Sequence, residues 1–198
     1  MKLLPTRTDL LRLLPKNLIM AEIGVFKGEF SQQILDICHP SLLYLVDLFS
    51  GRTSSGDKDG NNIQEADMDV EYEMISRRYE KNPHVNLIKS SSHFFLEASP
   101  SESIEIVYID ADHSYESVSR ELALCRDRVT DGGYICGHDY VNQWGVKRAV
   151  DEFCESEGLE IEYLTEDIYP SYCIINRKKP CHTQSRSMFT ASAIMSPA

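Results

Sequence analysis

A glycine-rich turn between an apolar run and a helical pattern constrains this chain more than any other feature. The turn lies in residues 21–31 (AEIGVFKGEFS), after the apolar residues 18–20 and before the helical pattern of 32–37. That order predicts a strand, a turn and a helix. A glycine turn at the carboxyl end of a strand lets a ligand approach bare backbone, so the pattern indicates a binding site there.

An acidic residue follows the next apolar run. Asp47 closes the run 42–46, roughly 20 residues after the turn, where a carboxylate is placed to bind ribose hydroxyls. The two features together predict a nucleoside-containing cofactor. Gly24 and Gly28 are present, but Phe26 stands where dinucleotide folds place a glycine. This weakens the case for a pyrophosphate, and an NAD-dependent oxidoreductase is kept as the first alternative.

Composition and charge narrow the class of protein. The 198 residues suit one domain, and the formal net charge of -11 argues against a nucleic-acid partner. No apolar run is long enough for a membrane span, and the first residues lack the apolar core of a secretion signal. The six cysteines form no Cys-x-x-Cys pair, which favours free thiols in a reducing compartment. We therefore expect a cytoplasmic protein, and a homodimer is left open.

Apolar runs alternate with helical patterns along most of the chain. This alternation predicts an α/β fold: a Rossmann-like, doubly wound, mainly parallel seven-stranded sheet with helices on both faces and an antiparallel last strand. One domain is expected over 1–177, with an N-terminal helical segment over 1–17 and a disordered tail over 178–198. The polar stretch 50–69 predicts a loop that folds over the site. Strands are expected at 18–24, 42–48, 85–89, 104–110, 134–137, 159–164 and 172–176, and helices at 6–16, 28–38, 71–81, 93–98, 116–128 and 146–157.

Five motifs in order resemble class I S-adenosylmethionine-dependent methyltransferases. They are the turn at 22–28, the acid Asp47, IDADHSYE at 109–116, DGGYICGHD at 131–139 and GVKRAV at 145–150. The set is similar to the small-molecule O-methyltransferase branch, which includes macrocin-type enzymes and relatives of cephalosporin hydroxylase. The resemblance covers about residues 18–176. It implies S-adenosylmethionine as the cofactor and a small molecule, methylated at a hydroxyl oxygen, as the acceptor.

The resemblance also assigns cofactor-binding residues. The turn would hold the methionine part of the cofactor, Asp47 would accept hydrogen bonds from the ribose, and Asp110 would lie near the methionine amino group. Leu48 or Phe49 would border the adenine, and Ser91 would lie near its edge. The implied set is Glu22, Gly24, Phe26, Lys27, Gly28, Asp47, Leu48, Ser91 and Asp110.

Two routes to deprotonating the acceptor stay open. Relatives of this type bind magnesium with acids at these strand ends, which implies a metal site at Asp110, His138 and Asp139. Because His138 stands where an acid is more usual, the site favours manganese, iron or zinc over magnesium, or no metal at all. The second route is a general base, His138 or His113. Asp110, His113 and His138 are therefore the expected catalytic residues, and a non-catalytic nucleoside-binding protein is the second alternative.

Overall fold

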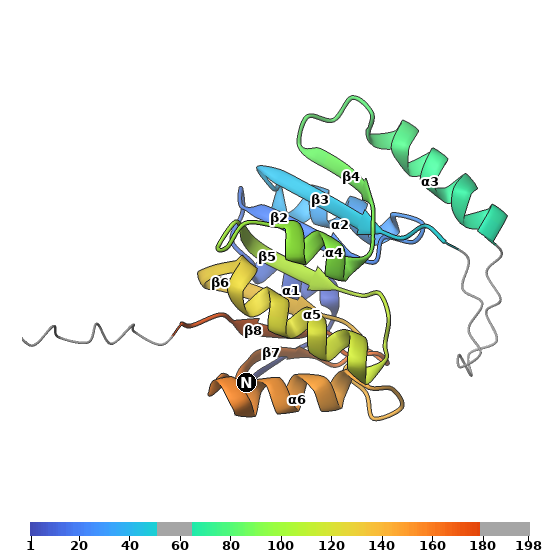
Figure 1. Cartoon of the computed structure of the whole chain (residues 1–198). Helices are drawn as coiled ribbons and strands as arrows, with labels where there is room; N and C mark the ends of the chain where they lie inside the picture. The colour runs from blue at the N-terminus through green and yellow to red at the C-terminus, as the bar shows by residue number, and fades with distance from the viewer. Residues whose placement is uncertain (51–64, 179–198) are drawn as a thin grey trace, which may run out of the picture.

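The described part of the chain folds into one eight-stranded mixed sheet between two layers of helices (Figure 1). The structure is a computed structural model that describes residues 1–50 and 65–178. Its elements are β1 (Lys2–Leu4), α1 (Arg7–Leu13), β2 (Ile19–Ile23), α2 (Glu29–Cys38), β3 (Leu42–Asp47), α3 (Glu65–Tyr79), β4 (Val85–Lys89), α4 (Ser92–Ala98), β5 (Ile104–Ile109), α5 (Tyr115–Arg128), β6 (Val129–Gly137), α6 (Val146–Glu157), β7 (Ile161–Thr165) and β8 (Tyr172–Ile175).

The strand order reverses between β5 and β2, and open α/β sheets have a crevice at the carboxyl ends of such strands. The order is β1-β7-β8-β6-β5-β2-β3-β4, and β8 runs antiparallel to both of its neighbours while the other pairs are parallel. From β2 the chain moves outward to β3 and β4, then returns to β5 on the other side of β2. Open α/β sheets bind ligands at the carboxyl ends of strands where the order reverses, so the fold directs attention to the ends of β2 and β5.

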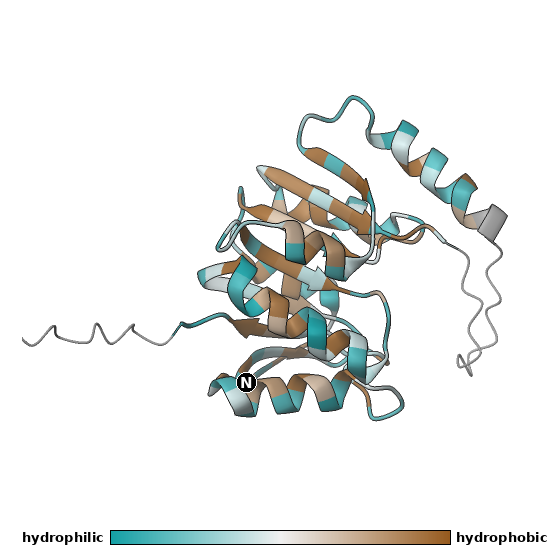
Figure 2. Cartoon of the chain, in the orientation of Figure 1, coloured by the Kyte–Doolittle hydropathy of each residue, from teal (hydrophilic) through white to brown (hydrophobic). Residues whose placement is uncertain are grey.

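Helices cover both faces of the sheet, as the sequence predicts. Leu122 of α5 and Val150 of α6 belong to a buried apolar cluster on one face. Leu11 of α1, Ile34 of α2 and Ile75 of α3 belong to the cluster on the other face. Hydrophobic residues dominate the central strands between these layers (Figure 2). Burial on both faces explains why β5 is almost continuously apolar in sequence.

The sheet has one strand more than predicted. The segment 1–17 is predicted as helical, but Lys2–Leu4 forms β1, which pairs in parallel with β7 through Leu3 and Leu164. A strand of three residues is too short to show an alternating pattern, and its partner is distant in sequence. Thr6 then caps α1 by accepting a hydrogen bond from the N–H of Asp9.

Two further boundaries differ from prediction. The strand predicted at 134–137 begins at Val129, because a bulge carries Gly132 at φ +78° within β6. The helix predicted from 71 begins at Glu65, inside the stretch predicted as a loop. The rest of that loop, 51–64, and the tail, 179–198, lie outside the described residues.

The five cysteines in the described part of the chain are free, as predicted (Cys38, Cys125, Cys136, Cys154 and Cys173). Among the described residues, no helix is both long enough and apolar enough to cross a membrane.

Candidate active site

The glycine turn packs directly against the end of β5. Gly24 has φ +91°, a conformation that strongly favours glycine. A Cβ atom at this position would lie 2.0 Å from the carbonyl oxygen of Asp110. The N–H of Asp110 in turn donates to the carbonyl of Ile23 at 2.7 Å. Glycine is therefore required at position 24 both by its φ angle and by the close approach of the two strand ends.

The carboxylate of Asp47 is held against this turn. Its Oδ2 accepts hydrogen bonds from the backbone N–H groups of Val25 at 2.8 Å and Phe26 at 3.0 Å. Its Oδ1 accepts from the N–H of Phe49 at 2.8 Å. Each carboxylate oxygen has two lone pairs, so these bonds leave acceptor capacity for ribose hydroxyls. The geometry fits the ribose-binding role implied for Asp47.

Glu22 lies beneath the turn and not on its surface. The residue is 1% exposed, and its Oε2 has no hydrogen-bond partner among the described residues. Burial raises the pKa of this carboxyl to about 8, the hydroxyl of Ser31 acts in the opposite direction, and Asp110 raises the pKa further. Glu22 is therefore largely protonated at neutral pH, which makes it a buried hydrogen-bond donor close to the turn.

The remaining residues of the implied cofactor set lie around this turn or shortly after the ends of β3 and β4. Phe26 is about half exposed at φ +49°, and the Lys27 ammonium lies 5.2 Å from the centroid of its ring. Gly28 caps α2 at φ +70°. Leu48 is exposed, and the hydroxyl of Ser91 caps α4 by accepting from the N–H of Phe94 at 3.2 Å.

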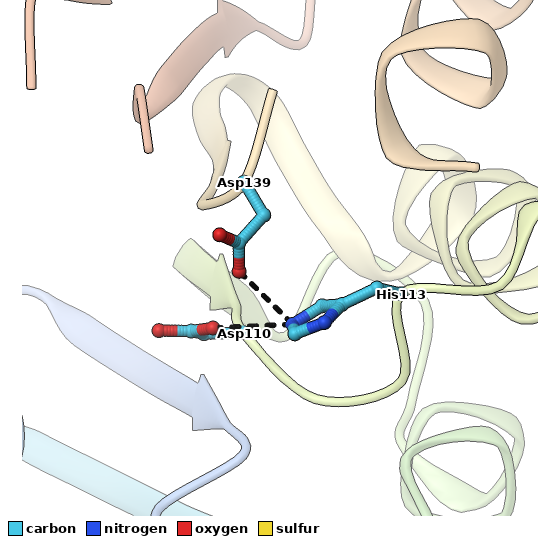
Figure 3. A group of neighbouring side chains, drawn as sticks. All are labelled: Asp110, His113 and Asp139. Carbon is cyan, nitrogen blue, oxygen red and sulfur yellow. Dashed lines mark ion pairs between the residues drawn. The ribbon is translucent and has the colours of Figure 1, made fainter. Parts of the chain in front are cut away.

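Two carboxylates and a histidine converge at the ends of β5 and β6 (Figure 3). Nε2 of His113 lies 3.0 Å from Oδ2 of Asp139 and 3.7 Å from Oδ1 of Asp110. Ligand atoms of these three residues all lie within 4.8 Å of one another, so one ion can contact all of them. We call this group the Asp-His-Asp cluster. Nδ1 of His138 borders it, 3.2 Å from Oδ2 of Asp139.

Charges in the cluster shift its pKa values in opposite directions. Burial lowers the pKa of His113, but the carboxylates of Asp110 and Asp139 outweigh burial and raise it to about 9. Burial acts to raise the pKa of Asp139, but His113 and His138 hold it well below its ordinary range. Without a metal the cluster is therefore an imidazolium between two carboxylates at neutral pH.

The cluster fits a divalent ion. Its two carboxylates suit magnesium and manganese, and its imidazole shifts the preference toward manganese, iron or zinc. The sequence implies His138 as the histidine ligand, whereas His113 is the histidine in the group of three. The loop after β5 folds back so that His113 lies beside the two acids, and the local sequence does not predict this loop conformation.

Aromatic side chains continue from the cluster toward the surface. The rings of His113 and Trp144 stack with centroids 5.1 Å apart, and Trp144 stacks on Tyr169 at 5.3 Å. Tyr169 is 42% exposed and lies between β7 and β8. The stack places flat apolar surface beside the acidic groups, a setting suited to an organic acceptor.

Sequence reasoning missed Arg7, the first residue of α1. Its Nη1 lies 3.7 Å from Oδ2 of Asp110, and its guanidinium lies 4.3 Å from the centroid of the Phe30 ring. Arg7 precedes an ordinary apolar helix pattern and belongs to no local motif. Only the packing of α1 beside α2 brings this cation to the crevice.

Comparison with known protein families identifies the family of this chain. A family model described as a methyltransferase domain matches residues 21–140, which is more than half of the chain. This chain belongs to the methyltransferase domain family. With the class I fold, membership makes S-adenosylmethionine the methyl donor. The match favours the methyltransferase interpretation over the NAD-dependent oxidoreductase. No curated protein matches the chain.

Solved methyltransferases share the fold at low sequence identity. Precorrin-6y C5,15-methyltransferase from Geobacter metallireducens GS-15 is 15% identical, with a TM-score of 0.55 and 85% of each chain covered. Aeropyrum pernix fibrillarin, with natively bound S-adenosyl-L-methionine, is 13% identical, with a TM-score of 0.55. The match covers 85% of this chain and 73% of that chain. The B. subtilis M1A22 tRNA methyltransferase TrmK is 12% identical, with a TM-score of 0.59, and the match covers 87% of this chain and 66% of that chain. These names include a tRNA enzyme, so the comparison does not support the exclusion of nucleic acid drawn from net charge.

Proposed function

We propose that this methyltransferase transfers a methyl group from S-adenosylmethionine to a hydroxyl oxygen of a small molecule. The observation that carries the proposal is the Asp-His-Asp cluster, which lies beside the glycine turn at the reversal point of the sheet. A hydroxyl is a poor nucleophile until it loses its proton, so an oxygen acceptor calls for such polar groups near the reacting methyl. The net charge of -11 favours a small molecule over a polyanionic acceptor.

The proposed cofactor site is built from the turn and its neighbours. Asp47 would bind the ribose hydroxyls, since its carboxylate already faces the turn through Val25 and Phe26. The turn would hold the methionine part, and Asp110 would lie near the reacting centre because its backbone packs on Gly24. In the reaction a bond forms between the acceptor oxygen and the methyl carbon while the bond between that carbon and the sulfonium sulfur breaks, which leaves a neutral thioether.

The acceptor proton is the part of the reaction assigned to the cluster. Asp110, His113 and Asp139 would hold a divalent ion, which when bound lowers the pKa of an acceptor hydroxyl. His138 would take the proton, since its ring borders Asp139 at 3.2 Å. Trp144 and Tyr169 would orient the acceptor against the site. Positioning of this kind lowers the barrier of a bimolecular transfer.

Calorimetry followed by an acceptor screen tests the proposed function. Purified protein is titrated with S-adenosylhomocysteine and with NAD, and it is expected to bind the first and not the second. Methyl-labelled S-adenosylmethionine is then supplied with hydroxylated small molecules, amines and total RNA in separate assays, each with and without a chelator. Label is expected on an oxygen of a small molecule, with turnover lost in chelator. Label on RNA or nitrogen would overturn the acceptor assignment, and turnover that resists chelator would move deprotonation to His138 alone.

A further inference from the structure

Arg7 is held in a fixed position at the crevice. Its backbone N–H donates to Oδ2 of Asp167 at 2.8 Å, which ties the start of α1 to the connection between β7 and β8. Its guanidinium lies over the ring of Phe30 at 4.3 Å, so packing restricts where the group can move. About a third of the side chain is exposed. The guanidinium is therefore ordered and accessible at once.

The guanidinium has donors available for a ligand. It forms an ion pair with Asp110 at 3.7 Å, which is longer than a hydrogen bond, and its side chain makes no hydrogen bond to any residue in the described ranges. A guanidinium has five N–H donors in a planar fork that matches a carboxylate. The contact with Phe30 is a cation–π contact and does not use the N–H donors in hydrogen bonds. The fork of donors therefore suits a bound carboxylate.

The two neighbours of the Arg7 side chain, Phe30 and Asp110, place it at the glycine turn. Phe30 lies in the first turn of α2, two residues after Gly28, and the backbone of Asp110 packs on Gly24. Arg7 also acts on the charge of Glu22, the carboxyl buried beneath the turn. Its position is therefore on the side of the crevice that borders the turn, whereas the aromatic stack of Trp144 and Tyr169 borders the Asp-His-Asp cluster.

Arg7 and Asp110 present opposite charges side by side. An α-amino acid carries an ammonium and a carboxylate on adjacent carbon atoms, so it needs an anion and a cation at this kind of separation. Asp110 directs Oδ2 toward Arg7 at 3.7 Å, while its Oδ1 lies 3.7 Å from His113. One carboxylate thus borders both the amino-acid side of the crevice and the proposed metal cluster.

The geometry points to Arg7 as the residue that binds the α-carboxylate of the methionine part of S-adenosylmethionine. This inference rests on the proposed cofactor and adds a residue that lies outside the matched family domain, 21–140. Arg7 is a binding residue on the N-terminal helix, so α1 forms part of the cofactor site. An anionic group on the acceptor is the competing occupant, and the position of Arg7 beside the turn disfavours it.

Two ligands that differ only at the amino acid isolate the contribution of Arg7. S-adenosylhomocysteine carries the amino acid, whereas 5′-methylthioadenosine keeps the nucleoside and thioether without it. Calorimetry on Arg7→Met is expected to show S-adenosylhomocysteine bound roughly ten- to a hundredfold more weakly, with the affinity for methylthioadenosine unchanged. Arg7→Lys keeps the charge without the fork, so an intermediate loss is expected. Arg12→Met is the matched control on the same helix, because Arg12 pairs with Asp9 at the surface.

The outcomes separate this inference from the proposed function. If wild-type protein bound neither ligand, the proposed function would fail. If Arg7→Met kept wild-type affinity for S-adenosylhomocysteine, or lost affinity for both ligands equally, the assignment of Arg7 would be overturned. If Arg7→Met raised the KM for the acceptor and left S-adenosylhomocysteine binding unchanged, Arg7 would bind the acceptor, and its assignment to the cofactor would be overturned. Thermal unfolding of each variant checks that α1 stays folded, and Arg7→Lys provides the comparison if Arg7→Met does not fold.

Discussion

Nε2 of His113 lies 3.0 Å from Oδ2 of Asp139, although the two residues belong to loops after different strands. The contact joins the end of β5 to the end of β6 at the crevice. Without a metal it is an ion pair, because the carboxylates of Asp110 and Asp139 raise the pKa of His113 to about 9. A metal held by this cluster would need the neutral imidazole, so its binding would be coupled to proton release.

Manganese binding is expected to depend on His113 more than on His138. Wild-type protein is expected to bind one Mn²⁺, measured by calorimetry or by the loss of the free-ion electron paramagnetic resonance signal. His113→Ala and Asp139→Asn each remove a ligand of the cluster and are expected to weaken binding at least tenfold, and His138→Ala to weaken it less.

Asp112→Asn is the control for these variants. Asp112 is exposed, and its Oδ1 accepts the N–H of Ser114 at 2.9 Å, so no change in manganese affinity is expected. The opposite ranking, with His138→Ala losing the ion and His113→Ala keeping it, would return the site to Asp110, His138 and Asp139.

Asp47→Ala is expected to weaken nucleoside binding whether or not the ligand carries an amino acid. The variant loses the proposed ribose contact and leaves the N–H groups of Val25, Phe26 and Phe49 without their acceptor. Affinity for both S-adenosylhomocysteine and 5′-methylthioadenosine is expected to fall roughly tenfold or more, and the free energy of unfolding by about 1–3 kcal/mol.

Asp36→Ala is the matched control for Asp47→Ala. Asp36 is an exposed acid on α2 whose carboxylate accepts from the side chain of Gln32, so its loss should leave ligand affinity unchanged. If Asp47→Ala bound methylthioadenosine as tightly as wild type does, the carboxylate would have no part in nucleoside binding.

The sequence predicts elements well where local chemistry decides them. The strand at 85–89 and the helix at 146–157 have the predicted bounds, because apolar periodicity fixes the first and Gly158 ends the second in a left-handed conformation. β1 was missed because its stability comes from pairing with β7 and not from its own three residues. The α3 boundary was wrong because the polar residues before Glu71 carry no clear helix-start signal.

Site residues that follow strand ends could be predicted from the sequence, whereas those placed by loop conformation or helix packing could not. The turn and Asp47 could be predicted to lie together, since both follow strands whose carboxyl ends meet at one edge. The resemblance implied His138 as the histidine of a possible metal site, whereas the structure groups His113 with Asp110 and Asp139, because the choice depends on how two loops return to the sheet. Arg7 could not be found, since only the packing of a separate helix brings it to Asp110.

Gly24→Ala is expected to destabilise the protein far more than Gly132→Ala. Both glycines have positive φ, +91° and +78°, so both variants carry the backbone strain of about 1–2 kcal/mol. At Gly24 the added Cβ also meets the carbonyl oxygen of Asp110 at 2.0 Å, whereas at Gly132 nothing lies within 4 Å.

Urea unfolding checks the glycine pair. The free energy of unfolding is expected to fall by about 1–2 kcal/mol for Gly132→Ala and by at least about 3 kcal/mol for Gly24→Ala. Equal losses in the two variants would mean that the turn and β5 separate at little cost, which is inconsistent with a preformed cofactor turn.

Glu121→Gln is expected to stabilise the protein in a pH-dependent way. Glu121 is 0% exposed in α5, and neither carboxylate oxygen has a hydrogen-bond partner among the described residues. Burial raises its pKa to about 7, the hydroxyl of Ser92 and the charge of His113 oppose this, and Asp112 adds to it. The folded state thus favours the protonated carboxyl, whose unfolded pKa is near 4.5.

The sign of the pH effect follows from these two pKa values. Protonated Glu121 contributes its stability fully below pH 4.5, and that stability is lost as the pH rises to about 7. Because Gln stays neutral, the variant should match wild type in acid and exceed its free energy of unfolding by about 3 kcal/mol above pH 7. Urea unfolding from pH 4 to 8 measures the difference, with Glu116→Gln as the control because Glu116 is exposed on the same helix. A difference that stays constant across this range would mean that folding does not raise the pKa of Glu121.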